Sequence, residues 1–293
     1  MGQQRTGKKL GITWTDETVN PLVGCMPVDG GLEGGCRNCW ASDMSPGLLA
    51  KGQVRHDGLT IINQRGHGQW TGKVSWNPAE LEKFKVGKAR RIFLNSISDT
   101  FYDRVQRDWQ DVMFKAMRDT PQHEYQVLTK RPAGMLKYVR DAGVQAMSNV
   151  LMGFSAENQR WFDERWKYAR QVADLGWRVW VSIEPQTAPI VLGEAVKGLS
   201  WVVIGGDNTK PHSHAREFDI AWAESLIAEC KAAGVPVFMK QVGVRPYRTV
   251  AGKVYSFKAT AEGKHMHEWP KAIQIQQFPP KVPDIPKDAA ERL

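Results

Sequence analysis

The sequence is poor in cysteine and has no long apolar run. Only four cysteines occur among 293 residues, which is too few for a disulfide-stapled secreted scaffold and is typical of a reducing compartment. No stretch reaches the roughly 18 apolar residues of a membrane-spanning helix. The N-terminal segment, MGQQRTGKKLGITWT, lacks the apolar core of a secretory signal. We therefore expect a cytoplasmic protein with no membrane partner.

Acidic side chains are also in short supply. Lys and Arg together number 40 and Asp and Glu 31, which gives a formal net charge of +9. A surplus of this size suggests a polyanionic partner, with a nucleotide or nucleic acid as the first choice. A generally basic surface is the simpler alternative. Hydrophobic residues make up 42% of the chain, which is enough for a sizeable core.

Three of the four cysteines are concentrated in one Gly-rich segment, residues 24–40. Cys25, Cys36 and Cys39 follow the spacing Cys-x10-Cys-x2-Cys. Glycine permits the backbone turns that direct several sulfurs to one point. Two centres suit such a set: a zinc ion, which normally needs a fourth protein ligand, or a 4Fe-4S cluster that keeps one iron open. The fourth cysteine, Cys230, falls in a helical pattern and is expected in the core.

The zinc alternative requires one more ligand from elsewhere in the chain. His56 is the most obvious candidate, and the pair His212 and His214 is a weaker one. In that case the protein would be a zinc-stabilised nucleic-acid-binding protein without redox chemistry. Trp70 and Trp76, in the irregular insertion, could stack on bases of a nucleic acid or could simply anchor a long loop to the barrel.

From about residue 90, short apolar runs alternate with helical patterns. The expected strands are 12–14, 91–98, 125–130, 150–157, 178–185, 201–207 and 235–241, and the expected helices are 109–120, 133–143, 158–176 and 219–234. Continuous apolar strands alternating with helices favour parallel βαβ units. We expect an α/β fold, a complete or partial (βα) TIM-type barrel, with a doubly wound open sheet as the alternative.

The remaining segments fit around this barrel. We assign residues 1–244 to the barrel, with a loose N-terminal arm and the cysteine loop. An insertion at 52–80 would be irregular or would form a hairpin around 71–78, and a short helix after Cys39 would be interrupted by Pro46. The segment 188–200 is expected to be a loop with one turn. Residues 245–293 would form a C-terminal cap followed by a mobile, Pro-rich tail.

Polar residues stand where each predicted strand ends. They are Asn95, Ser96, Ser98, Asp99, Thr129, Lys130, Arg131, Ser155, Glu157, Asn158, Ser182, Glu184, Gly205, Gly206, Asp207, Asn208, Lys240 and Gln241. Because the carboxyl ends of barrel strands meet at one face, these residues predict a shared pocket. Individually, Asp99 and Asn158 would also serve as helix N-caps.

Some of these residues have a specific chemical use. Gly205 and Gly206 allow backbone amides to approach a ligand closely, and Asp207 suits a ribose hydroxyl or an amine. Glu184 would be costly to bury without a cation. That cation would be a lysine or arginine from a neighbouring strand end, namely Lys130, Arg131 or Lys240, or else the ammonium group of a bound cofactor.

Across residues 12 to about 270 the sequence resembles the phage-associated three-Cys-motif proteins, and its plan is similar to that of radical S-adenosylmethionine (SAM) enzymes. The motifs that carry the resemblance are WTDETVNP (14–21), GC (24–25), CRNCW (36–40), TGKVSWNP (71–78), RRIFLNSISD (90–99), QVLTKRP (126–132), SAEN (155–158), SIEP (182–185), GG (205–206) and KQ (240–241). The family is common in phage and bacterial genomes.

The resemblance implies a 4Fe-4S cluster on the three cysteines, with SAM on the open iron, and a reductant protein as electron donor. The residues it implies for SAM are Asn95, Ser96, Ser98 and Asp99 near the amino group, Ser155, Glu157 and Asn158 near the ribose, and Gly205, Gly206 and Asp207 alongside. It makes Lys130, Glu184 and Lys240 the catalytic candidates, with Lys130, Arg131 and Lys240 available to anions. The implied activity is modification of a nucleotide or nucleic-acid base in a phage context.

Overall fold

The computed structural model describes residues 12–28, 34–64, 66–141, 143–257, 260 and 263–281. The predicted N-terminal arm, the middle of the cysteine loop and the Pro-rich tail beyond residue 281 lie outside the described residues. No helix in the described part of the chain is long and apolar enough to cross a membrane.

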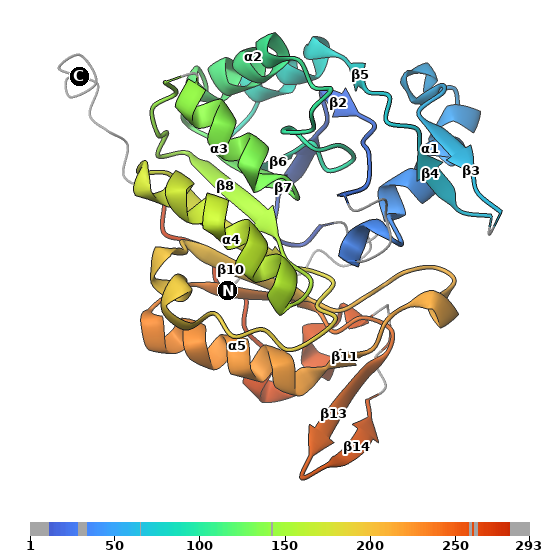
Figure 1. The fold of residues 1–293 in the computed structure, drawn as a ribbon, viewed down its shortest axis with the longest axis vertical. Helices are drawn as coiled ribbons and strands as arrows, with labels where there is room; N and C mark the ends of the chain where they lie inside the picture. Colours follow the sequence, from blue (N-terminus) through green and yellow to red (C-terminus); the bar gives the residue numbers. More distant parts are fainter. Residues whose placement is uncertain are drawn as a thin grey trace.

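A seven-stranded parallel sheet forms the centre of the molecule (Figure 1). Its strands are β1 (Glu17–Val19), β6 (Arg91–Leu94), β7 (Glu124–Thr129), β8 (Val150–Ser155), β9 (Arg178–Ile183), β10 (Trp201–Gly205) and β12 (Val237–Gln241). They lie side by side in the order of the sequence. A doubly wound sheet would reverse that order at one point, so this alternative was wrong. Within the described residues β1 and β12 remain edges, which makes the barrel partial.

Four α-helices cover the outer face of the curled sheet, as Figure 1 shows. They are α2 (Arg107–Arg118), α3 (Pro132–Asp141), α4 (Gln159–Asp174) and α5 (Ile220–Ala233). All four predicted helices and six of the seven predicted strands are confirmed to within a few residues. The turn expected in 188–200 is the 3-10 helix η5 (Gly193–Gly198). The first strand was predicted wrongly at 12–14, because β1 begins at Glu17.

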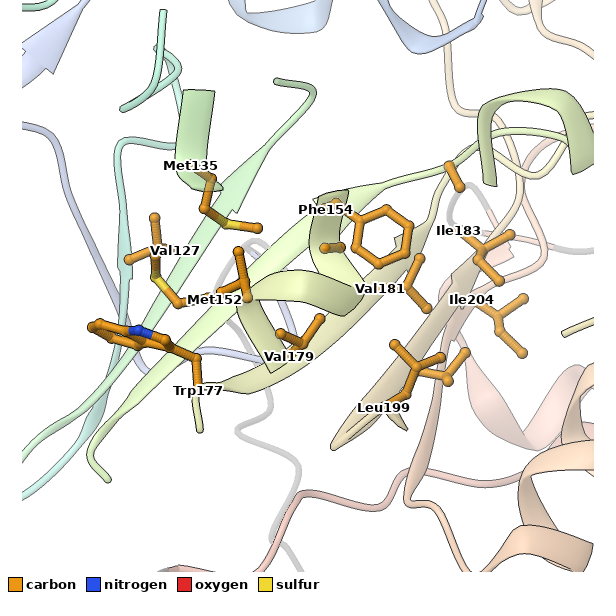
Figure 2. Packing of buried hydrophobic residues seen from close by; sticks show 14 of the residues in the cluster. Val127, Met135, Met152, Phe154, Trp177, Val179, Val181, Ile183, Leu199 and Ile204 are labelled. Atoms are coloured by element: carbon orange, nitrogen blue, oxygen red, sulfur yellow. The ribbon is translucent and has the colours of Figure 1, made fainter. Parts of the chain in front are cut away.

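Alternation along the strands separates two apolar layers. Side chains such as Val127, Met152 and Val181 face the helices and pack with Met135 of α3 in the larger hydrophobic cluster (Figure 2). The residues between them point to the concave side, as period-two geometry requires. A buried parallel strand therefore contributes apolar side chains to both faces, which explains its continuous apolar sequence.

Aromatic rings fill the concave side of the sheet. Trp14, Phe93, Trp180, Trp201 and Phe238 belong to this second cluster. The centroids of the Trp14 and Trp180 rings lie 5.3 Å apart, and those of Trp180 and Trp201 lie 5.2 Å apart. Along β6, β9, β10 and β12 the aromatic residues come before the polar strand ends. Their rings therefore fill the interior of the partial barrel on the side away from the polar residues. The polar strand ends remain at the other mouth, where catalytic groups of such barrels are found.

The cysteine loop is followed by α1 (Trp40–Ala50), η3 (Val54–His56) and a hairpin of β3 (Thr60–Ile62) with β4 (Gly68–Trp70). The hairpin predicted around 71–78 was misplaced, because β5 (Ser75–Trp76) pairs with β2 (Leu22–Val23) and η4 (Pro78–Lys85) follows. Pro46 does not interrupt α1. The backbone of Gly68 packs so closely on the Ser42 carbonyl, four residues before Pro46, that a Cβ there would lie 2.1 Å from its oxygen.

The C-terminal part packs on the far edge of the sheet. Strand β11 (Phe218–Asp219) pairs with β13 (Pro246–Val250), which pairs with β14 (Lys253–Ser256). The short turns η8 (Met266–Glu268) and η9 (Lys271–Ile273) follow. Ile273 is fully buried in the larger cluster, and Gln276 bridges to Phe238 of β12. This segment therefore covers the free edge of β12.

Candidate functional site

The start of the cysteine loop is tied to the ends of β6 and β7. Ser98 donates a hydrogen bond of 2.6 Å from Oγ to the Gly24 carbonyl. Buried Asp99 accepts from Thr129 Oγ1 at 2.6 Å and from the Lys130 backbone N–H at 3.0 Å. The Asp99 carboxylate also pairs with Arg131 at 3.3 Å. One carboxylate thus fixes the loop after β7.

Arg131 carries this connection to the first cysteine. Its Nη1 lies 3.9 Å from Cys25 Sγ, and its Nη2 donates to the Met26 carbonyl. Burial raises the pKa of the Cys25 thiol to about 12, with a further increase from Asp99 that Arg131 opposes. A thiol with this pKa is neutral at physiological pH.

Glu157, directly after β8, holds the second part of the loop. Its side chain is completely buried, and its Oε1 accepts from the Gly35 N–H at 3.0 Å and from Lys130 Nζ at 2.7 Å. Its Oε2 pairs with Arg165 of α4 at 2.9 Å. Burial alone would raise the pKa of Glu157, but Lys130 and Arg165 lower it to about 2. The loop therefore binds a permanent carboxylate one residue before Cys36.

A side chain at position 35 would disrupt this contact. A Cβ on Gly35 would lie 2.9 Å from Glu157 Oε1 and 3.0 Å from Lys130 Nζ. Burial raises the pKa of the Cys36 thiol, and the nearby Lys130 ammonium opposes this effect. The glycine is thus needed for a close approach of loop backbone to the strand end.

The three predicted metal ligands lie in the same region of the molecule. Cys25, Cys36 and Cys39 are half-buried free thiols, and Cys36 and Cys39 each act on the pKa of Cys25. Among the residues that the structure describes, no three Cys, His, Asp or Glu side chains are arranged to hold a single metal ion. The fold brings the three thiols to one rim of the barrel, but these side chains do not converge on a single ion.

The predicted zinc ligands do not join the cysteines. His56 is buried, and its Nδ1 shares a hydrogen bond of 2.9 Å with Ser45 Oγ of α1. His214 lies with its ring centroid 5.6 Å from that of His67. His212 and His214 form the ends of the short turn η6 (His212–His214). Within the described chain, neither candidate completes a four-ligand site with the thiols.

Glu184, at the end of β9, meets the strand ends of β12. Its Oε1 accepts from Lys240 Nζ at 2.5 Å and from Gln241 Nε2 at 2.9 Å. Of the cations proposed from sequence, Lys240 is therefore the partner, whereas Lys130 binds Glu157. Both hydrogen bonds use Oε1, and the side chain keeps 16% of its surface exposed. Gly205 adjoins Glu184, since a Cβ there would lie 3.1 Å from the carboxylate.

Asp207 and Gly206 have structural contacts in the loop after β10. Asp207 accepts from the Thr209 N–H at 2.8 Å and pairs with Arg216 Nε at 2.6 Å. A Cβ on Gly206 would lie 2.4 Å from the Val242 carbonyl oxygen. These contacts join the loop after β10 to the chain after β12, and the ligand-binding role of both residues stays a prediction.

Several other predicted ligand residues also have partners within the protein. Asn95 adopts a left-handed φ of 58°, accepts from the Leu22 N–H and donates to Thr100 Oγ1. Ser96 donates to Asn20 at 3.0 Å. Asn158 caps α4 by accepting from the Trp161 N–H at 3.1 Å, which confirms its predicted capping role. Asp99 caps a turn rather than an α-helix.

Ser155 and Ser182 occupy the concave face near the rim. They are register partners on β8 and β9, and both are buried. In the same face, Gly153 accommodates the Trp180 indole, because a Cβ there would lie 2.3 Å from the ring. The two serines therefore lie between the aromatic layer and the charged rim.

Both tryptophans of the insertion support its fold. Trp70 is buried in a small cluster with Val23, Ala41 and Leu59. Trp76 stacks on Trp109 of α2 with an interplanar angle of 7°. The anchoring alternative is therefore the one the structure shows.

Sequence reasoning missed Arg165 as part of the site. It lies on the buried stripe of α4 with Phe162, Ala169 and Val172. A charged residue on an otherwise apolar helical stripe was the available signal, since such a charge needs a buried partner.

A large cavity adjoins the second and third cysteines and was also not predicted. Its volume is about 1240 Å³, and Cys36 and Cys39 lie in its wall. The hairpin β3–β4 and the segment 213–216 form two other walls. In Figure 1 this hairpin and the chain after β10 lie on the same side of the molecule.

Comparison with solved structures finds a distant likeness in chain path. Spore photoproduct lyase bound to dinucleoside spore photoproduct aligns at 14% identity and a TM-score of 0.40, over 88% of this chain and 72% of that one. A spore photoproduct lyase variant with bound AdoMet and the same dinucleoside aligns at 14% identity and 0.42, with the same coverage. Agreement at this level carries no inference about activity.

Comparison with protein families gives a match over most of the chain. No curated protein matches the sequence. One family profile, described as "Protein of unknown function (DUF5131)", matches residues 9–270. The matched region includes the cysteine loop, the insertion and every strand of the parallel sheet. The chain therefore belongs to this family, DUF5131.

Proposed function

We propose that this protein is an iron–sulfur enzyme of the radical SAM type that modifies a nucleotide or a nucleic-acid base. One observation carries the proposal: three half-buried thiols gather at the polar mouth of a parallel partial barrel. Their loop is fastened there by two strand-end carboxylates, Asp99 and Glu157. A purely structural loop does not need this attachment to the catalytic face of a barrel.

The donor set fits a cluster better than a single zinc ion. A zinc ion needs about four ligands converging at bonding distance, and the described residues offer no such group. In a 4Fe-4S cluster each thiolate of Cys25, Cys36 and Cys39 would bind a different iron, so the sulfurs need not converge on one atom. Three cysteines would leave the fourth iron open to an exogenous ligand.

With SAM bound, such a cluster would supply one-electron chemistry and hydrogen abstraction. The protein's own residues would hold the reactants in register and exclude water. Glu157 and Asp99 would position the cysteine loop through Gly35 and Arg131. Glu184 uses only Oε1 toward Lys240 and Gln241, so its Oε2 would accept from an ammonium or hydroxyl group of a ligand.

The remaining predicted residues have narrower places in this proposal. The Ser155 and Ser182 hydroxyls on the concave face would donate to a ligand seated above the aromatic layer. Gly205 would leave room beside Glu184. Lys240, partly exposed beside Glu184, would meet a phosphate or carboxylate. The net charge of +9 supports an anionic substrate.

The proposal is tested by SAM cleavage in protein purified and reconstituted without air. With a chemical reductant in place of the reductant protein, the wild type should release 5′-deoxyadenosine, whereas Cys36→Ala should not. Cys230→Ala is the matched control, because Cys230 is buried in α5 within the larger hydrophobic cluster. Release at the wild-type rate by Cys36→Ala, or none from a wild-type protein that carries a full cluster, would overturn the proposal.

A further inference from the structure

The cavity beside Cys36 and Cys39 has a strongly one-sided charge. Among the described residues of its wall are Arg37, Arg216, Arg245 and two histidines, and the single carboxylate among them is Asp43. That carboxylate is already engaged, since its oxygens accept from the Gly68 N–H at 2.8 Å and face a His67 ring nitrogen at 3.2 Å. The cavity therefore presents mainly cationic groups to a ligand.

Two of the arginines are well placed to meet an anion. Arg37 is exposed between Cys36 and Asn38, and no salt bridge joins it to any described residue. Arg245 Nη1 donates to the Ala215 carbonyl at 3.1 Å, and its Nη2 pairs with Glu217 at 2.6 Å, with exposed side-chain fractions of 46% and 59%. An exposed pair of this kind contributes little stability, so the end of the Arg245 side chain that binds Glu217 can turn to a phosphate. Arg216 is committed to Asp207.

The same cavity has an apolar rim. Ile61 and Ile62 of β3 line it while remaining 57% and 59% exposed. Elsewhere in the cavity wall, Asn38 Nδ2 donates to the His214 carbonyl at 3.4 Å, which brings the cysteine loop to the segment after β10. Apolar contact surface next to cationic side chains lets one site contact the bases and the phosphates of a ligand together.

The cavity is larger than one small ligand requires. Pockets for drug-sized molecules are roughly 300–1,000 Å³, and this one measures about 1240 Å³. A ligand with repeated negative charges and repeated flat apolar groups could fill this volume and contact both the arginines and the isoleucines of the wall.

We infer that this cavity binds a single-stranded segment of nucleic acid, with its phosphates at Arg37 and Arg245 and its bases along Ile61 and Ile62. One base would thereby reach the side of the cavity formed by Cys36 and Cys39. The inference rests on the proposed function only for what happens to that base. Binding itself requires neither cluster nor SAM.

The test is fluorescence anisotropy of a labelled single-stranded oligonucleotide of mixed sequence, titrated at several salt concentrations. The double variant Arg37→Gln, Arg245→Gln should bind roughly tenfold more weakly at about 50 mM salt. Its slope of log K against log salt should fall by about 0.7 for each charge removed, so by about 1.4. Unlabelled mononucleotide should compete poorly.

Arg248→Gln is the matched control. Arg248 lies on β13 in an ion pair with Glu224 and is 44% exposed, against 46% for Arg245, but it is not part of the cavity wall. Its substitution should leave the affinity nearly unchanged. Equal affinities for the wild type and the double variant, an equal loss in Arg248→Gln, or full competition by mononucleotide would overturn the inference.

The outcome is separable from that of the proposed function. Anisotropy is measured on each protein whether or not iron is bound, with circular dichroism confirming that every variant is folded. Oligonucleotide binding by protein that never takes up iron would support the cavity inference and refute the proposed chemistry. A cluster-bearing, SAM-cleaving protein without this binding would do the reverse.

Discussion

Asp207 shows, at the scale of one residue, why a polar strand end is ambiguous in the sequence. Its position after two glycines predicted a ligand contact, and the structure adds an intramolecular role, because its oxygens accept from Thr209 and Arg216. The partner lies nine residues further along a loop without any periodic pattern, so the sequence could not reveal the pair. By contrast, the N-cap role of Asn158 was predictable because capping is local.

The Asp207–Arg216 pair predicts a pH-dependent stability. Burial raises the pKa of Asp207, but Arg216 and the hydrogen bonds from Thr209 together outweigh this and lower the pKa below the ordinary 3.8. The folded state thus favours the carboxylate, so the stabilisation is fully present well above pH 3.8 and is lost as pH falls toward the lower folded pKa. Asp207→Asn should reduce the free energy of unfolding by about 2 kcal/mol at neutral pH.

Urea denaturation of both proteins across a pH series checks this prediction. The difference in unfolding free energy between wild type and Asp207→Asn should stay constant above about pH 5. It should shrink at lower pH, where the Asp207 carboxylate of the wild type becomes protonated. A difference that grows at low pH would contradict the assignment of the ion pair.

At the scale of the elements, the sequence was most informative where strands are buried on both faces. Strands β6 to β10 and β12 show continuous apolar runs, and the helices between them show their own period. Strand β1 has only three residues and pairs on one side, which is too short for a pattern. The hairpin β3–β4 has an exposed face, and its half-buried sequence resembled an irregular loop.

The concave face of β8 and β9 predicts a strict size limit. Gly153 of β8 faces the Trp180 indole, and a Cβ would lie 2.3 Å from its atoms. Gly153→Ala should therefore force the aromatic layer apart and lower the free energy of unfolding by about 2 kcal/mol. The shift in thermal unfolding midpoint measures the effect.

Gly47→Ala provides the comparison, because a Cβ at this position in α1 meets nothing within 4 Å. It should be neutral or stabilising by roughly 0.5–1 kcal/mol, as alanine is the better helix former. A Gly153→Ala protein as stable as Gly47→Ala would show that the indole has room to move.

At the scale of the whole molecule, the order of strands and the position of the mouth followed from the alternation of elements. The cavity did not, because its wall combines residues near positions 37, 61, 67, 214 and 245. No local pattern links segments so far apart in the chain. The positive net charge indicated a polyanionic partner, but only the fold shows where cationic side chains of the protein come together.

The central claim is that the three thiols hold an iron–sulfur cluster, and iron analysis of protein kept from air tests it most directly. The account predicts about four irons and four sulfides per chain, retained in Cys230→Ala and lost in Cys36→Ala. A colourless wild-type protein with one tightly bound zinc, or an iron content unaffected by Cys36→Ala, would contradict it.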